Sequence, residues 1–216
     1  VSNGAFEYTV GMDVSDILDV LNEAQRSAVA AEQGNQLVLA GAGSGKTRVL
    51  VHRIAWLIRA EGLSPYSVMA VTFTNKAARE MRGRIEEMLG RPTQGLWIGT
   101  FHGLAHRLLQ THWAEAGLPQ NFQILDSDDQ LRLVKRVCRE LGLDDAKWPP
   151  RQAQWFINGQ KDEGLRAGHI DPPLGDLYTK TMVKIYASYE EACQRGGLVD
   201  FAELLLRAHE LWLKSP

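Results

Sequence analysis

The sequence predicts an α/β fold in which a parallel β-sheet with flanking helices is followed by a mainly helical region. Three short apolar runs predict buried strands, at residues 36–40, 67–72 and 96–100. A stretch with helical periodicity follows each run, and this alternation is typical of βαβ units with a parallel sheet. Ligands of such sheets bind at the carboxyl ends of the strands, so site residues are expected there.

Helices are predicted where apolar residues recur every three or four positions. In the first half they cover residues 16–32, 46–59, 76–89 and 102–115. In the second half they cover residues 127–141, 152–158, 177–195 and 199–214. Ser127 is the expected N-cap of one of these helices and Gly142 the residue just beyond its end. We expect the boundary between the two halves near residues 101–117.

The composition is that of an ordinary globular protein. Of 216 residues, 44% are hydrophobic and 23% are charged, and the formal net charge of -2 gives no global basic field for nucleic acid. Cys138 and Cys193 fit no disulfide scaffold or zinc ribbon, which favours the reducing cytoplasm. We expect no membrane span and no signal peptide. Because Met12 is a plausible native start, residues 1–11 are expected to be foreign to the native protein or a flexible N-terminus.

A glycine-rich motif follows the first predicted strand and opens the next helix. It reads Ala40-Gly41-Ala42-Gly43-Ser44-Gly45-Lys46-Thr47. Small residues let backbone N–H groups turn inward around phosphate oxygens, and the helix N-terminus adds partial positive charge. In such a phosphate loop Lys46 reaches the β- and γ-phosphates of ATP, and the Thr47 hydroxyl binds Mg²⁺. We therefore predict an ATP site, although Ala40 stands where the general pattern has glycine.

The loop alone does not define the reaction, because kinases, GTPases and transporters use it too. Hydrolysis also needs an acidic residue at a strand end, and the two candidates are Asp126 and Asp200. Asp126 has no Glu after it and precedes a helix start, while Asp200 leads into a run with helical periodicity. Neither is convincing, and three strands are few for such a sheet. The fold is therefore expected to be cut short, without the acidic Walker B motif.

Four further stretches resemble motifs of the UvrD/Rep-type superfamily 1 DNA helicases. Residues 21–26 resemble the glutamine motif, in which the amide of Gln25 would read the adenine edge. Residues 70–78 resemble motif Ia and residues 98–104 resemble motif Ib. Residues 197–205 resemble a short motif of the accessory region. The order and spacing of these motifs match the family across nearly the whole chain from Met12 onward.

The resemblance implies a P-loop NTPase (RecA-like) parallel sheet, truncated here. Residues 12–100 would be the first part of motor subdomain 1A with the ATP-binding loop, and residues 101–216 a mainly helical, 1B-like subdomain. The parent would be an ATP-dependent DNA helicase that moves 3′-to-5′ on single-stranded DNA and unwinds duplex. It would act at single-strand/double-strand junctions in DNA repair, with repair proteins as possible partners, in the cytoplasm. Without the second motor domain, the piece alone is expected to be inactive.

The family's site residues carry over position by position. Contacts to ATP and its Mg²⁺ would come from Gln25, Ala40, Gly41, Ala42, Gly43, Ser44, Gly45, Lys46, Thr47 and Arg48. Lys46 and Thr47 would be the catalytic residues, with Thr47 holding the metal. Contacts to DNA would come from Phe73, Thr74, Asn75, Thr100 and His102. Phe73 would stack on a base, and the polar side chains would contact phosphates.

Two other classes of function stay open from the sequence. A small-molecule kinase would use the same loop but needs a lid and an acceptor pocket, and a non-catalytic module would bind proteins through the helical half. His102 and His106 have a spacing that suits zinc, without an HExxH motif or a further ligand. Four basic residues at 132–139 are in reach of duplex phosphates, but nearby acids favour a solvated helix face.

Overall fold

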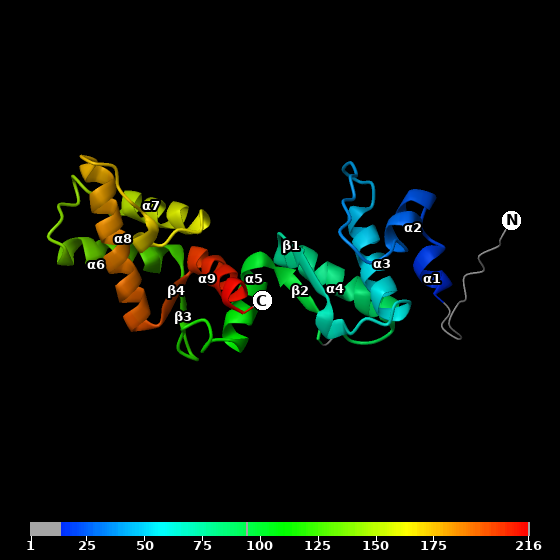
Figure 1. Cartoon of the computed structure of the whole chain (residues 1–216). Coiled ribbons are helices and arrows are strands. Elements are labelled where there is room, and N and C mark those ends of the chain that lie inside the picture. Colours follow the sequence, from blue (N-terminus) through cyan, green and yellow to red (C-terminus); the bar gives the residue numbers. More distant parts are fainter. Residues whose placement is uncertain (1–13, 94, 216) are drawn as a thin grey trace. The chain divides into compact units, whose positions relative to one another are not determined.

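The computed structural model describes residues 14–93 and 95–215, so the expectation for residues 1–11 lies outside the described residues. The chain divides into two compact units, one ending at Thr100 and the other beginning at Phe101. Each unit is mainly helical and contains one two-stranded parallel sheet (Figure 1). The interpretation of the units as subdomains 1A and 1B stays a prediction.

The first unit contains four α-helices and two strands within the described residues. These are α1 (Ser15–Leu18), α2 (Glu23–Val29), α3 (Lys46–Arg59), the 3₁₀ turn η1 (Pro65–Ser67), β1 (Met69–Thr72), α4 (Asn75–Leu89) and β2 (Trp97–Thr100). The strands are parallel, with Met69 opposite Trp97 and Thr72 opposite Thr100, so their carboxyl ends lie at the same edge. A core formed mainly by apolar side chains of α3 and α4 packs against this sheet.

The predicted buried strand at residues 36–40 is wrong. This segment carries no strand pairing, and Leu37, Val38 and Leu39 are 83%, 44% and 85% exposed. Within residues 14–93 and 95–100 the two strands pair with each other, and neither pairs with this run. A strand needs a neighbouring strand to pair its backbone hydrogen bonds and to bury its apolar side chains, and no strand of the described residues pairs with this segment.

The single predicted helix over residues 16–32 is also wrong, because α1 and α2 are separate. Asn22 lies at the break with extended backbone, and its side-chain oxygen accepts a hydrogen bond from Gln25 N at 2.9 Å. In return Gln25 Oε1 accepts one from Asn22 N at 3.2 Å, which completes a capping box. Periodicity cannot reveal this break, because Leu21 is buried at the position that a continuous helix would also bury.

The second unit is built from longer helices. Its elements are α5 (Phe101–Thr111), β3 (Gln123–Leu125), α6 (Ser127–Glu140), α7 (Pro150–Asp162), the 3₁₀ turn η2 (Ala167–His169), α8 (Leu177–Gly196), β4 (Leu198–Asp200) and α9 (Phe201–Lys214). The strands β3 and β4 are parallel, with Gln123 opposite Leu198. The main core lies among α6, α7 and α8, and α5 packs against α9 in a smaller one (Figure 1).

Several predicted helix ends in this unit need correction. The helix expected over 102–115 ends at Thr111, and the one expected over 152–158 extends from Pro150 to Asp162, since proline is tolerated in a first turn. The N-cap of α6 is Asp126 rather than Ser127: the Asp126 side chain accepts a hydrogen bond from Asp129 N at 2.7 Å. Gly142 does lie just beyond α6, with a φ of 68°.

The helix expected from residue 199 begins at Phe201, because residues 198–200 pair with β3. Asp200 then caps α9, with its Oδ1 accepting from Glu203 N at 2.8 Å. Asp126 and Asp200, the two acidic candidates at strand ends, therefore both cap helices.

Candidate nucleotide and nucleic-acid site

The glycine-rich loop turns sharply before α3. Gly43 and Gly45 have φ angles of 74° and 87°, a left-handed conformation that side chains with a Cβ rarely adopt. Gly45 is the N-cap of α3 and Lys46 its first residue, so the loop ends where unpaired helix N–H groups gather. A Cβ added at Gly41 or Gly43 would meet no atom within 4 Å, which shows that this side of the loop is open to a ligand.

The Lys46 ammonium is held over the loop by backbone oxygens. Its Nζ donates to Ala40 O at 2.9 Å and to Gly41 O at 2.6 Å, and Ser44 Oγ donates to Gly41 O at 2.7 Å. Neutral carbonyls position the charge without cancelling it, and in the described part of the chain no carboxylate pairs with Lys46. The exposed ammonium is therefore available to an anion, and the segment is neither extended nor filled by an acidic side chain.

Gln25 is brought to this loop although it lies on another helix. Its Nε2 donates to Ser44 O at 3.1 Å, while its Oε1 accepts from Asn22 N in the capping box. Both polar ends of the amide are thus occupied by the protein, so reading an adenine edge would require exchanging these bonds. The adenine role of Gln25 stays a prediction.

A cavity of about 530 Å³ lies over the loop. Its lining includes Gln25, residues 43–47, Arg48 and Arg84. Arg84 comes from α4, on the far side of β1 in the sequence, and was not predicted. No signal in the sequence distinguishes it, because it is one of several arginines on a charged helix. With Lys46 and Arg48, it surrounds the cavity with three positive charges, which suits a polyphosphate.

The predicted DNA-side residues follow the two parallel strands of the first unit. Phe73 comes directly after β1 and is 89% exposed. Thr74 caps α4, its Oγ1 accepting from Ala77 N at 3.1 Å, and Asn75 is the first residue of that helix. Thr100 ends β2 and pairs with the residue before Phe73. The structure thus brings four of the five predicted residues to one sheet edge.

The fifth residue, His102, belongs to the second unit, where it is exposed. Its ring meets that of Phe201 edge-to-face, with centroids 6.0 Å apart, and His106 meets Phe122 in the same way at 5.6 Å. In residues 14–93 and 95–215, no group of three or more His, Cys, Asp or Glu residues could hold a metal ion.

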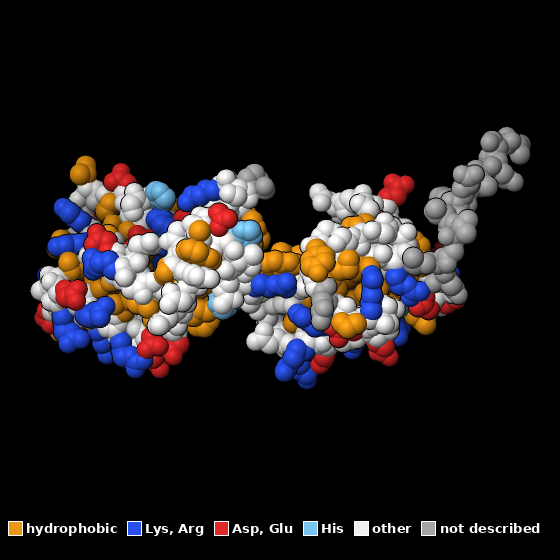
Figure 2. All heavy atoms as spheres, turned by 90° about the horizontal axis from the view of Figure 1, so that it is seen from below, with side chains coloured by type: hydrophobic (Ala, Val, Ile, Leu, Met, Phe, Trp, Pro, Cys, Tyr) orange, Lys and Arg blue, Asp and Glu red, His pale blue; other side chains and the backbone are white. Residues whose placement is uncertain are grey.

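The basic residues of α6 do not form a continuous basic surface. Arg132 pairs with Asp129, and Arg136 Nε lies 3.7 Å from Glu140 Oε1. Figure 2 shows Lys and Arg side chains interspersed with Asp and Glu on the face that it presents. The arrangement is that of a solvated helix face, where exposed pairs contribute little to stability.

Comparison with known proteins identifies the family. The profile of the UvrD/REP helicase N-terminal domain matches residues 21–216, which is nearly the whole chain. The chain belongs to this family.

Named relatives agree with this assignment. The chain is 66% identical to DNA helicase II of Escherichia coli over 205 residues, covering 95% of this chain and 28% of that protein. It is 58% identical to DNA helicase II of Haemophilus influenzae, covering 95% and 29%. It is 38% identical to the ATP-dependent DNA helicase PcrA of Bacillus subtilis, covering 94% and 27%. The chain thus spans less than a third of the length of these relatives. Within the described ranges, no helix is long and apolar enough to cross a bilayer.

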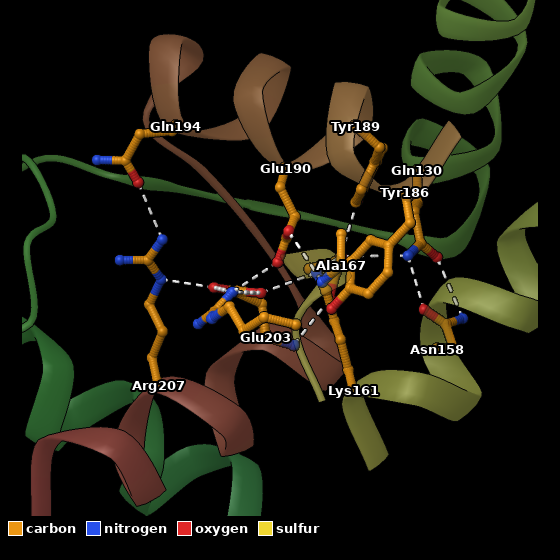
Figure 3. A network of polar contacts seen from close by, with 12 residues as sticks. Gln130, Asn158, Lys161, Ala167, Tyr186, Tyr189, Glu190, Gln194, Glu203 and Arg207 are labelled. Atoms are coloured by element: carbon orange, nitrogen blue, oxygen red, sulfur yellow. Dashed lines mark hydrogen bonds and ion pairs between the residues drawn. The ribbon is translucent and has the colours of Figure 1, made fainter. Parts of the chain in front are cut away.

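One part of this UvrD/REP domain was missed by the sequence analysis: a buried network of charges around Glu203 (Figure 3). Lys161 Nζ lies 2.7 Å from Asp200 Oδ2 and 2.8 Å from Glu203 Oε2. These three residues are 3%, 2% and 4% exposed. Arg207 Nε also donates to Glu203 Oε1 at 2.6 Å. Burial would raise the pKa of Glu203, but Lys161, Arg166 and Arg207 outweigh it and hold that pKa at about 2.

The network extends to α8 and is saturated with hydrogen bonds. Arg166 binds both oxygens of Glu210, at 2.8 and 2.7 Å, and also contacts Glu190 at 3.2 Å. Asp200 Oδ2 additionally accepts from the Tyr189 hydroxyl at 2.7 Å. No buried side-chain N or O atom in the described part of the chain lacks a partner. The network ties α7, α8 and α9 together.

Proposed function

We propose that this chain is the nucleotide-binding N-terminal part of an ATP-dependent DNA helicase. Its parent would move 3′-to-5′ along single-stranded DNA, unwind duplex at single-strand/double-strand junctions and act in DNA repair in the bacterial cytoplasm. The names of the relatives, DNA helicase II and ATP-dependent DNA helicase PcrA, support this proposal. The observation that carries it is the glycine-rich loop before α3. Gly43 and Gly45 have left-handed backbone conformations there, and two backbone carbonyls hold the Lys46 ammonium above the loop.

The residues around the loop fit a nucleoside triphosphate. Lys46 would contact the β- and γ-phosphates, the loop amides would cradle them, and Arg48 and Arg84 would neutralise further negative charge. The Thr47 side chain is exposed, as a ligand of Mg²⁺ must be. The metal, when bound with ATP, would supply positive charge that offsets the negative charge of the phosphates. Gln25 would select adenine after releasing its bonds to the protein.

The strand ends of the first unit fit a single strand of nucleic acid. Phe73 offers an exposed face for stacking a base, and the start of α4 at Thr74 and Asn75 offers N–H groups to a phosphate. Thr100 would add a contact from the neighbouring strand. His102, which belongs to the second unit, is proposed as a separate contact to DNA. In this proposal β1 and β2 belong to a RecA-like sheet, and the units are subdomains 1A and 1B.

Nucleotide binding can be tested on this chain with a fluorescent ATP analogue. Lys46→Ala should weaken binding by about 10- to 100-fold, because charge-assisted hydrogen bonds contribute roughly 1.5–3 kcal/mol each. Lys76→Ala is the matched control, since Lys76 is an exposed lysine on α4 outside the cavity lining. Equal affinity of the Lys46→Ala and unmodified chains would refute the nucleotide site.

DNA binding can be tested by fluorescence anisotropy with a labelled oligothymidylate. Phe73→Ala should weaken binding by about tenfold, since stacking one base on an aromatic ring contributes roughly 1–3 kcal/mol. Tyr66→Ala removes another exposed aromatic side chain of the same unit, 73% exposed, and should have little effect. An equal loss in both variants, or none in either, would contradict the proposed role of Phe73.

Hydrolysis by this chain should be negligible. Asp126 follows β3 and Asp200 ends β4, and both side chains cap helices, so we expect neither to act as the acidic residue that turnover needs. Phosphate release measured with and without single-stranded DNA checks this. Robust turnover that Lys46→Ala abolishes would show that a different acid serves the site.

A further inference from the structure

A groove in the second unit lies outside the network and every predicted site. It has a volume of about 650 Å³ and lies between the loop at residues 171–176 and the first three turns of α8. Pro172, Pro173 and Leu174 form one side, and Leu177 and Val183 line the helix side. The groove is therefore mainly apolar.

The apolar side chains of this groove are unusually exposed. Leu174 is 106% exposed and Leu177 is 61% exposed, and they lie on opposite sides of Gly175. Exposed apolar side chains that cluster around a groove are typical of interaction sites, whereas single exposed leucines are ordinary. The two leucines together mark a surface suited to burying apolar groups of a partner.

The helix side of the groove is held in place before any partner binds. Asp176 caps α8, its carboxylate accepting from Thr179 N at 2.9 Å and from the Thr179 hydroxyl at 2.6 Å. Tyr178 stacks on Trp148, with ring centroids 6.1 Å apart and planes 25° apart. These contacts fix the start of α8, so little ordering entropy would oppose binding.

The charged lining residues of the groove are two lysines and one carboxylate, so its net charge is positive. Lys180 and Lys184 are one turn apart on the exposed face of α8, and neither forms an ion pair within residues 95–215. The carboxylate of Asp176, which also lines the groove, is already engaged by Thr179. Asp171 is exposed just before the groove and is not among its lining residues. Two unpaired ammonium groups thus flank an apolar depression.

We propose that this groove docks an acidic amphipathic helix of another protein. Apolar side chains spaced three or four residues apart on that helix would fill the depression between Leu174 and Leu177. Carboxylates beside them would face Lys180 and Lys184. These charge pairs would fix the orientation of the bound helix and raise the rate at which it associates. A nucleic acid fits less well, because two lysines beside aliphatic walls offer neither a phosphate track nor a stacking platform. This proposal does not depend on the nucleotide site.

The test uses the 216-residue chain and two labelled synthetic peptides of identical leucine and glutamate composition. In one, leucines repeat along a single helical face, and in the other the same residues are scrambled. The patterned peptide should bind at low salt, and Leu177→Asp and the double variant Lys180→Glu/Lys184→Glu should each weaken binding by about tenfold. Lys135→Glu, an exposed charge reversal on α6, should leave the affinity unchanged.

The results distinguish docking of an amphipathic helix from nonspecific binding and from binding of a nucleic acid. Circular dichroism that matches the unmodified chain shows that each variant is folded, as expected for exposed positions. No binding of the patterned peptide, equal binding of the scrambled one, or equal loss with Lys135→Glu would overturn the proposal. Displacement of the peptide by an oligonucleotide, with a loss of oligonucleotide affinity in the Lys180→Glu/Lys184→Glu variant, would overturn it in favour of a nucleic-acid surface.

Discussion

Lys161→Met removes the cation at the centre of the buried network while keeping a side chain of similar length. Asp200 would keep Tyr189 as a donor, and Glu203 would keep Arg166 and Arg207. What is lost are two charge-assisted contacts, at 2.7 and 2.8 Å, between side chains that are at most 5% exposed. Breaking a buried pair by removing one partner typically costs about 3–5 kcal/mol, because the remaining charge cannot regain water.

Urea unfolding followed by circular dichroism measures this cost. The transition of the second unit should move to lower urea with an unchanged slope, by an amount equal to about 3–5 kcal/mol in the free energy of unfolding. Lys135→Met, an exposed lysine on α6, should change it by less than about 0.5 kcal/mol. Adding Asp200→Asn to Lys161→Met should recover part of the loss, since it removes an uncompensated carboxylate. A loss below about 1 kcal/mol for Lys161→Met would refute the view that the network stabilises this unit.

Three more predictions concern acid stability, the loop and a cap. Folding lowers the pKa of Glu203 from 4.5 to about 2, so the ionised carboxylate stabilises the folded state fully above pH 4.5 and loses this effect as the pH falls towards 2. The loss in the free energy of unfolding approaches roughly 3 kcal/mol. Urea midpoints that stay constant from pH 6 to pH 2.5 would contradict this prediction. Gly45→Ala should weaken ATP-analogue binding, because Gly45 has a φ of 87° and the new Cβ would lie 2.9 Å from Gln25 Nε2. Gly83→Ala is the control, because Gly83 lies in a helix with open space around it. This variant should bind the analogue normally, and its free energy of unfolding in urea should rise by up to about 1 kcal/mol. Asp126→Ala should cost about 1 kcal/mol in the same assay, as loss of an N-cap does, and no change would argue against capping.

Local chemistry made part of the fold predictable. The helix at Lys46–Arg59 was predicted with its observed bounds, because glycines before it and an apolar period within it are both local signals. The N-cap of α6 was missed by one residue, since Asp126 and Ser127 are both good capping residues and the sequence does not rank them. For the site, the loop and Gln25 were predicted, while Arg84 was not, because nothing in a charged helix marks which arginine faces a cavity.

Features that depend on distant partners were not predictable in the same way. The run at residues 36–40 has the composition of a buried strand, but its burial depends on a neighbouring strand that local sequence does not specify. Lys161, which is 3% exposed, was not singled out from the sequence, because no local pattern distinguishes a buried lysine from a solvated one. Its partners, Asp200 and Glu203, are about forty residues away in the sequence, and only folding brings them together.

The side-chain amide of Gln25 already makes two hydrogen bonds within the protein, and this affects how it could select a base. A ligand that takes this amide must break two existing contacts, each contributing roughly 1 kcal/mol, before it gains its own. If Gln25 recognises a base as proposed, binding would exchange these hydrogen bonds with little net gain in free energy. The exchange would act mainly against bases that cannot replace the two broken bonds. Breaking these two hydrogen bonds would also loosen the first turn of α2 and remove its contact with Ser44. A bound base would therefore make the start of α2 less ordered.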